Sequence, residues 1–202
     1  MRRVVVLVLL ALALPIAAWA DGITLTNQFG TVSVSTGGIS SIGSQLHSFN
    51  NIVAAPGHSL GSVSFTTGAM TSGTLAGGGT FSSAGSTFNI VGKGNWAQGH
   101  NTAIFTGSFT GNITWTLTAV SGQTKTYTLA GAIVGQLWDG RTVSGTTTQT
   151  IFVLNNNQFL QGIGHIHTGT TNINVPEPGT LGLLGTGLVG IAGMFRRKLI
   201  GG

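Results

Sequence analysis

The sequence predicts an all-β fold, namely an antiparallel β-sandwich or jelly-roll-like domain, plus one C-terminal transmembrane helix in the precursor. Between residues 21 and 175, hydrophobic residues alternate with a period of two in several segments, and no segment shows sustained helical periodicity. Turn-forming Gly, Asn and Pro residues separate these segments, and no helical pattern lies between them. A β-solenoid is the rival architecture, but the short recurring sequences follow no fixed period.

The clearest strand pattern covers residues 112–120. Its apolar face carries Ile113, Trp115, Leu117 and Ala119, and threonines occupy most of the other face. We expect a turn at Thr110-Gly111-Asn112 to join this strand to residues 102–110 as a hairpin. Further strands are expected at residues 62–67, 80–83, 86–91, 125–137, 146–154 and 164–175, whereas residues 36–60 are the least regular.

The N-terminal 20 residues have the three parts of a secretory signal peptide. Two arginines precede an apolar run at residues 4–14, which Pro15 ends, and small residues Ala18 and Ala20 then precede Asp21. We therefore expect a signal peptidase to cleave between Ala20 and Asp21. The alternative is an uncleaved N-terminal anchor, although an apolar run of this length is too short to span a bilayer core of roughly 30 Å.

The formal net charge of +5 does not describe the exported region. Most basic residues flank the apolar segments at the two ends of the chain, namely Arg2, Arg3, Arg196, Arg197 and Lys198. Residues 21–175 keep only Lys93, Lys125 and Arg141 against Asp21 and Asp139, and such scattered cations argue against a nucleic-acid partner. The chain has no cysteine, so burial and backbone pairing must hold the domain together without disulfides.

The C-terminal 27 residues, 176–202, form a separate segment after the Thr/Ser/Gly-rich domain at 21–175. Pro176, Glu177 and Pro178 follow Val175, residues 179–195 contain no charge, and Arg196, Arg197 and Lys198 come next. The uncharged stretch predicts a transmembrane helix at the short end of the usual range, and the basic cluster predicts a cytoplasmic tail.

This order of elements resembles the PEP-CTERM sorting signal over residues 175–199. The resemblance implies that an exosortase, a membrane protease, cuts the chain near Pro176, Glu177 and Pro178 and recognises these residues. It also implies a Gram-negative bacterium that makes extracellular polysaccharide or biofilm matrix. A plain tail anchor behind a proline-rich stalk is the alternative interpretation.

The composition of the exported region argues against an enzyme. Residues 21–175 contain no Glu and only two Asp, so the paired carboxylates of a glycosidase are absent. Asp139 lies in the sequence Trp138-Asp139-Gly140-Arg141, which is typical of a turn, and no Gly-x-Ser-x-Gly sequence accompanies it. We expect a non-enzymatic protein without catalytic residues or cofactors.

Two candidate binding sites remain as hypotheses. His165 and His167 would face the same way on a strand and are metal-ligand candidates, but with no carboxylate or cysteine nearby we favour surface imidazoles. Trp96, in a polar loop at residues 93–101, and Trp138, at a strand end, are candidate glycan contacts, because aromatic rings stack on sugars.

The sequence therefore predicts an exported, non-enzymatic surface or extracellular-matrix protein, associated with exopolysaccharide or biofilm and sorted through its C-terminal PEP motif. A carbohydrate-binding module that uses exposed Trp residues is the alternative. The expected partners are signal peptidase, an exosortase-like membrane protease and extracellular polysaccharide, with no nucleic acid. The precursor would be anchored in the inner membrane by its C-terminal helix, and the product would reach the cell surface or matrix.

Overall fold

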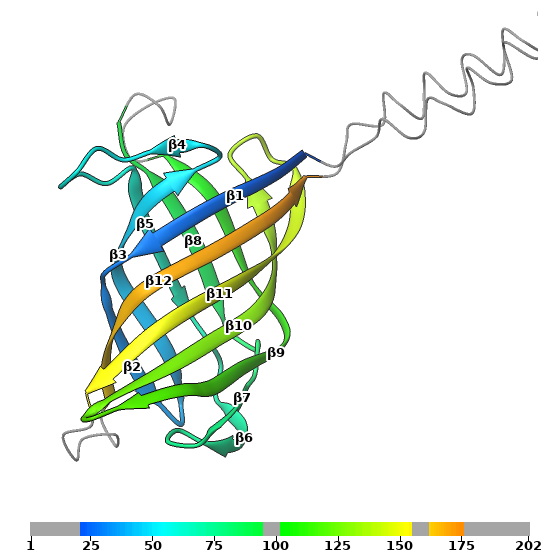
Figure 1. Ribbon diagram of the computed structural model, residues 1–202. Helices are drawn as coiled ribbons and strands as arrows, with labels where there is room; N and C mark the ends of the chain where they lie inside the picture. Colours follow the sequence, from blue (N-terminus) through cyan, green and yellow to red (C-terminus); the bar gives the residue numbers. More distant parts are fainter. Residues whose placement is uncertain (1–20, 95–101, 155–161, 176–202) are drawn as a thin grey trace, which may run out of the picture. The chain divides into compact units, whose positions relative to one another are not determined.

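The computed structural model describes residues 21–94, 102–154 and 162–175, and its strands belong to one β-sheet (Figure 1). Residues 22–174 form one compact unit. In chain order the strands are β1 (Asp21–Gln28), β2 (Thr31–Ser35), β3 (Gly38–Phe49), β4 (Ile52–Val53), β5 (Gly61–Thr66), β6 (Met70–Thr74), β7 (Gly78–Phe81), β8 (Thr87–Gly92), β9 (Ala103–Ser121), β10 (Thr124–Leu137), β11 (Thr142–Leu154) and β12 (Gly162–Val175).

The predicted all-β class is confirmed, since the described ranges contain strands and no helix. Accordingly, no helix within these ranges is long and apolar enough to cross a membrane. The helix predicted at residues 179–195 lies outside the described residues, as does the signal peptide at residues 1–20.

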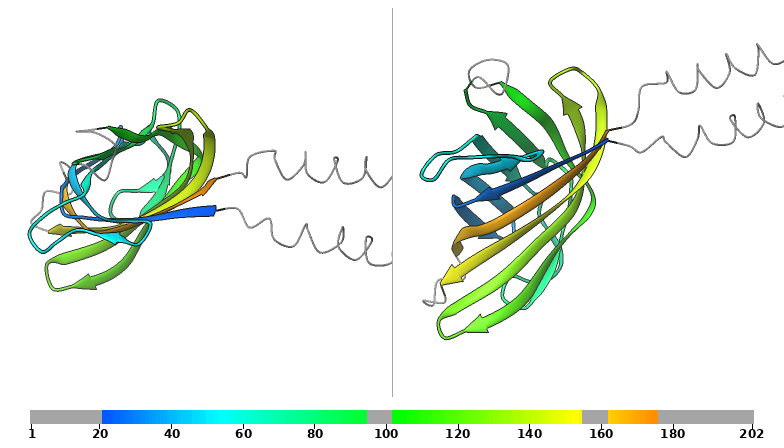
Figure 2. Two further views of the ribbon diagram at one scale, coloured as in Figure 1. Left: turned by 90° about the horizontal axis from the view of Figure 1, so that it is seen from above. Right: turned by 45° about the horizontal axis from the view of Figure 1, so that its top comes forward.

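The predicted sandwich or jelly roll is wrong, because the sheet closes on itself as an eight-stranded antiparallel barrel. The wall runs in the order β10, β11, β12, β1, β3, β5, β8 and β9, and β9 then pairs with β10. β2 continues the path of β1 along β3. Figure 2 shows the resulting ring from above. Alternating hydrophobic residues indicate which face of a strand is buried. That face can pack against a second sheet, as in a sandwich, or against the opposite wall of the same sheet, as in a barrel, so the pattern does not distinguish the two folds.

The predicted hairpin at Gly111 is also wrong, because residues 102–121 do not fold back on themselves. β9 runs continuously from residue 103 to 121, and Gly111 forms a β-bulge with φ of 69°. Thr110 pairs with Ala132 and Thr114 pairs with Ala130, so the extra β9 residues lie opposite Gly131. A Cβ atom on Gly131 would lie 2.8 Å from the Phe109 ring, so glycine allows this close approach.

The other predicted strands correspond to β5, β7, β8, β10, β11 and β12, with ends that differ by a few residues. The irregular region at residues 36–60 contains the long strand β3. On β9, Ile113 and Trp115 are buried as predicted, but Leu117 is only half-buried and Ala119 is exposed. β9 pairs with β7 only as far as Thr116. Beyond that residue, its ladder partner among the described strands is β10, up to the end of the β9–β10 hairpin.

Aromatic side chains fill the interior. Phe88 lies 5.7 Å from Phe109 and 6.1 Å from Phe65, measured between ring centroids. Trp115 and Tyr127 stack at 4.4 Å and donate hydrogen bonds of 2.9 Å to the carbonyl oxygens of Leu75 and Ala76, respectively. These residues lie in the turn between β6 and β7, so the aromatic pair fixes this hairpin to the barrel.

A buried hydrogen-bond network lies in the wall formed by β1, β3, β11 and β12. The Asn27 amide donates to Gln149 Oε1 at 2.9 Å and to Ser44 Oγ at 2.7 Å, while Gln149 Nε2 donates to Asn27 Oδ1 at 3.2 Å. Gln149 Nε2 also donates to Thr147 Oγ1, whose hydroxyl pairs with that of Thr171 at 2.8 Å. These interior polar groups are therefore paired with one another, as burial requires.

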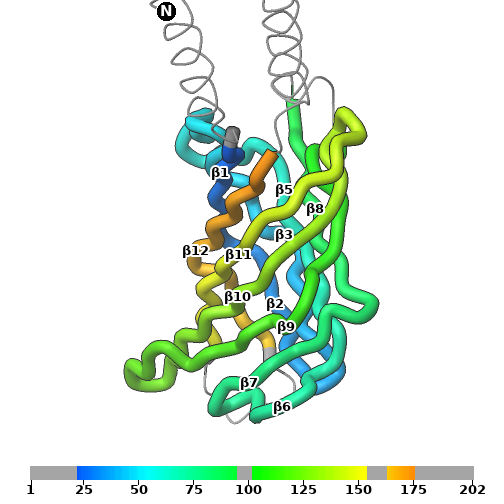
Figure 3. The backbone as a smooth tube through the Cα atoms, turned by 90° about the vertical axis from the view of Figure 1, so that its right-hand side faces the viewer, coloured from blue at the N-terminus to red at the C-terminus, as the bar shows by residue number. Residues whose placement is uncertain are grey.

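β1 and β12, the first and last strands of the chain, lie side by side in the wall (Figure 3). The hydroxyl of Thr24 on β1 donates to Asn172 Oδ1 on β12 at 3.0 Å. Because the barrel is antiparallel, the start of β1 and the end of β12 reach the same rim of the barrel.

Candidate functional site

The outer surface of β9–β12 carries threonines in rows that cross the strands. One row consists of Thr116, Thr128, Thr150 and Thr168, which are register partners from strand to strand. The adjacent outward rows follow the same register. We call the following eight residues the hydroxyl face: Thr114, Thr116, Thr128, Thr146, Thr148, Thr150, Thr168 and Thr170.

Most hydroxyl groups of this face are free to bind a ligand. Thr114 donates to the carbonyl oxygen of Ala130 at 3.2 Å. The other hydroxyls of the face have no hydrogen-bond partner within the described ranges of the chain. Neighbouring rows are separated by about 6.8 Å along a strand and neighbouring strands by about 4.8 Å, so the face repeats donors and acceptors at regular intervals.

The turn that follows β10 presents Trp138, which is 44% exposed. Beside it, Arg141 Nε contacts Asp139 Oδ2 at 2.6 Å, and the Arg141 backbone N–H donates to Asp139 Oδ1 at 3.0 Å. The backbone hydrogen bond from Arg141 is the main cause that lowers the pKa of Asp139, and the Arg141 guanidinium adds to the effect. Trp96, the other predicted glycan contact, lies outside the described residues.

His165 and His167 both lie exposed on β12. The His167 ring stacks on Phe152 of β11 with centroids 4.4 Å apart, and His165 is the register partner of Thr31 on β2. Within the described ranges, no three His, Cys, Asp or Glu residues are grouped in a way that could hold a metal ion.

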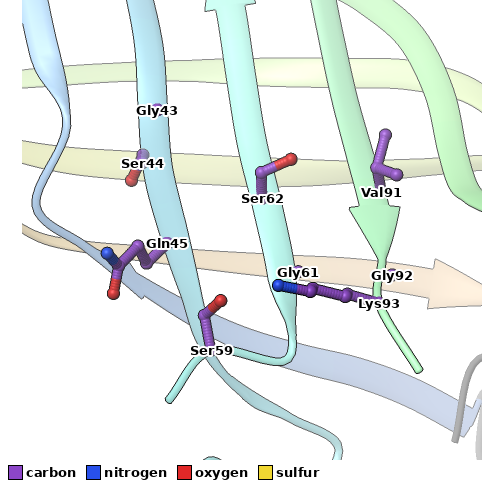
Figure 4. Close-up of a pocket in the computed structure, with 9 residues that line it drawn as sticks. All are labelled: Gly43, Ser44, Gln45, Ser59, Gly61, Ser62, Val91, Gly92 and Lys93. Carbon is purple, nitrogen blue, oxygen red and sulfur yellow. The ribbon is translucent and has the colours of Figure 1, made fainter. Parts of the chain in front are cut away.

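An open pocket of about 240 Å³ lies over β3, β5 and the end of β8. Figure 4 shows the Lys93 side chain extending across Gly61 towards Gln45 and Ser59. The pocket wall also includes Ser44 and Ser62, so a lysine, a glutamine and three serines border one hollow. This pocket could not be predicted from the sequence, because its residues come from separate segments and follow no local motif.

The described part of the sorting signal predicted from the sequence is Val175, which is the last residue of β12 and is 6% exposed. The predicted recognition residues Pro176, Glu177 and Pro178 lie outside the described residues, and so do Arg196, Arg197 and Lys198. The same holds for Ala18 and Ala20 of the predicted signal-peptidase site, whose third residue, Asp21, begins β1.

A family model for the PEP-CTERM protein-sorting motif matches residues 174–198, which confirms the predicted sorting signal. This motif implies an exported protein that is sorted through an exosortase, with a membrane-anchored precursor that is processed to the cell surface in Gram-negative bacteria. No curated protein and no solved structure matches the chain.

Proposed function

We propose that the chain is a non-enzymatic protein of the cell surface or extracellular matrix, whose barrel contacts extracellular polysaccharide through the hydroxyl face. The observation that carries this proposal is the set of outward-facing hydroxyls without protein partners on four adjacent strands. Polysaccharides present hydroxyl groups at similarly short intervals along an extended chain. Each hydrogen bond contributes only about 0.5–1.5 kcal/mol, but many along one chain give useful binding.

The charges of the described residues support a role without catalysis. The Asp139 carboxylate, the only one among the side chains that the structure describes, forms an ion pair with Arg141 in a surface turn. General acid–base chemistry usually requires a titratable group poised near the working pH, whereas the pKa of Asp139 is lowered from an already acidic value. The proposal therefore assigns binding rather than chemistry to the barrel.

The test removes hydroxyls from one row of the hydroxyl face. A variant with Thr128→Val, Thr150→Val and Thr168→Val keeps β-branched side chains and loses three hydroxyl groups. We expect its affinity for the host's purified extracellular polysaccharide, measured by co-sedimentation, to fall about tenfold, since three bonds at about 0.5 kcal/mol each give about 1.5 kcal/mol.

The matched control carries Thr66→Val and Thr87→Val. These hydroxyls lie on β5 and β8, away from the hydroxyl face, and bond to each other at 2.9 Å. The control should bind polysaccharide as the unmodified protein does. Undiminished binding by the triple variant, with an unchanged melting temperature, would contradict the proposal.

A carbohydrate-binding module is the second candidate, and the exposed ring of Trp138 favours it. In this case Trp138→Ala would abolish binding to polysaccharide, whereas the triple threonine variant would bind normally. A single aromatic ring contacts only one sugar ring, so this candidate also predicts saturable binding of short oligosaccharides.

A further inference from the structure

The sorting motif and the barrel share residues. The match to the motif begins at residue 174, and β12 continues to Val175. Asn174 and Val175 therefore belong both to the last strand of the fold and to the signal that an exosortase processes. Pro176 follows directly, so the sequence provides no linker between barrel and motif.

The shared residues are held by the sheet. Asn174 is the register partner of Ser144 on β11, and the Val175 side chain is buried. On the other side of β12 lies β1, where Thr24 bonds to Asn172. While these pairings persist, the backbone of Asn174 is committed to the ladder with β11.

A protease generally needs the chain near the cleavage point to leave its sheet before that chain can enter an active site. When opening and closing are faster than cleavage, the rate of proteolysis follows the population of the open state. Strand ends open locally at a much lower free-energy cost than global unfolding.

We propose that the C-terminal end of β12 must detach from β11 and β1 before the exosortase can process the motif. Processing is then controlled by the local stability of this barrel rim. This inference rests on the sorting part of the proposed function, and it adds that the folded barrel restrains its own processing.

Gly145 offers a perturbation that lies outside residues 174–198. A Cβ atom at this position would lie well within 3.0 Å of the Asn172 carbonyl oxygen on β12, so Gly145→Ala should loosen the β11–β12 ladder near the rim. Gly107→Ala is the matched control, because its Cβ would meet the Val134 carbonyl oxygen equally closely, but between β9 and β10.

The experiment follows conversion of the full-length precursor to the processed form in the native host by pulse-chase labelling. Gly145→Ala should accelerate conversion about tenfold, which corresponds to about 1.4 kcal/mol. Gly107→Ala should convert within about twofold of the unmodified chain.

A second variant covers the case in which Gly145→Ala fails to fold. A six-residue Gly-Ser insertion between Ile173 and Asn174 leaves residues 174–198 intact and moves them away from β12. This variant should also be processed faster than the unmodified chain.

The outcomes separate this inference from the proposed function. An unmodified precursor that is never processed overturns the sorting itself. Normal processing of the unmodified chain, with no acceleration by the insertion, overturns the inference about β12. Equal acceleration by Gly145→Ala and Gly107→Ala also overturns it, because global instability would then control processing.

Discussion

The reciprocal amide pair between Asn27 and Gln149 should account for a large part of the stability of the barrel. Both side chains are fully buried, and they bond to each other twice over Gly169 of β12, the strand that lies between β1 and β11. Gln149 additionally donates to Thr147. Replacing Gln149 by Met keeps a side chain of similar length and removes all three hydrogen bonds.

The expected loss follows from the atoms that remain. In Gln149→Met, Asn27 Nδ2 keeps its bond to Ser44 Oγ, but Asn27 Oδ1 loses Gln149 Nε2, its hydrogen-bond donor among the described residues. A buried polar atom without a partner costs about 1–3 kcal/mol, and the lost bonds themselves contribute about 1 kcal/mol each, partly offset by the apolar Met. We therefore expect a decrease of about 2–4 kcal/mol in the free energy of unfolding.

Urea denaturation of the processed protein, followed by tryptophan fluorescence, would measure this decrease. For a domain of this size, 3 kcal/mol corresponds to a fall in melting temperature of roughly 6–12 °C. Adding Asn27→Leu removes the orphaned oxygen, so the double variant should be more stable than the sum of the single changes implies, by about 1–2 kcal/mol. A single-variant loss below about 1 kcal/mol, or strict additivity, would refute the reasoning.

Three further predictions concern the bulge, the surface ion pair and the sorting signal. Gly111→Ala should cost about 1 kcal/mol in urea denaturation, because the position has φ of 69° but open space around it, and an unchanged stability would contradict the assigned bulge. Arg141→Gln keeps the backbone N–H that contributes most to the lowered pKa of Asp139 and removes the guanidinium, so it should raise this pKa only part of the way towards 3.8 in an NMR titration. Because the folded-state pKa is lowered, the stabilisation by these contacts exists above pH 3.8 and is lost as the pH falls through the lowered pKa. Glu177→Ala should leave unprocessed precursor in the membrane fraction on immunoblots, whereas normal processing would show that Glu177 is dispensable.

Alternation predicted which side chains enter the core. Tyr127, Leu129, Ile133 and Leu137 recur every second or fourth residue, and all are buried on β10. The rule succeeds here because β10 has wall partners on both sides along this whole segment. It failed for Ala119, because a register shift in the β9–β10 ladder places Leu117 opposite the buried Tyr127 but Ala119 opposite Thr126, which belongs to the other face.

The architecture depended on pairings that no local pattern encodes. The sequence Thr110-Gly111-Asn112 satisfies the composition of a hairpin turn and also that of a bulge within one long strand. The partner decides between them, since β10 pairs with β9 on both sides of Gly111 and holds the chain extended. Closure likewise depends on the pairing between β9 and β10 together with the seven other strand pairs around the ring.

The candidate site follows from the same dependence on register. The sequence alone predicts that one face of each of the strands β9 to β12 carries hydroxyls, for example at Thr114, Thr128, Thr148 and Thr168. Their combination into rows could not, because a one-residue shift in any ladder would turn that strand's threonines into the interior and bring its apolar residues to the surface. Register is fixed by burial of residues such as Leu129 and Ile151 on the opposite face. The apolar core therefore determines the outer arrangement of hydroxyls, and a variant that shifts one ladder should lose polysaccharide binding even with every threonine retained.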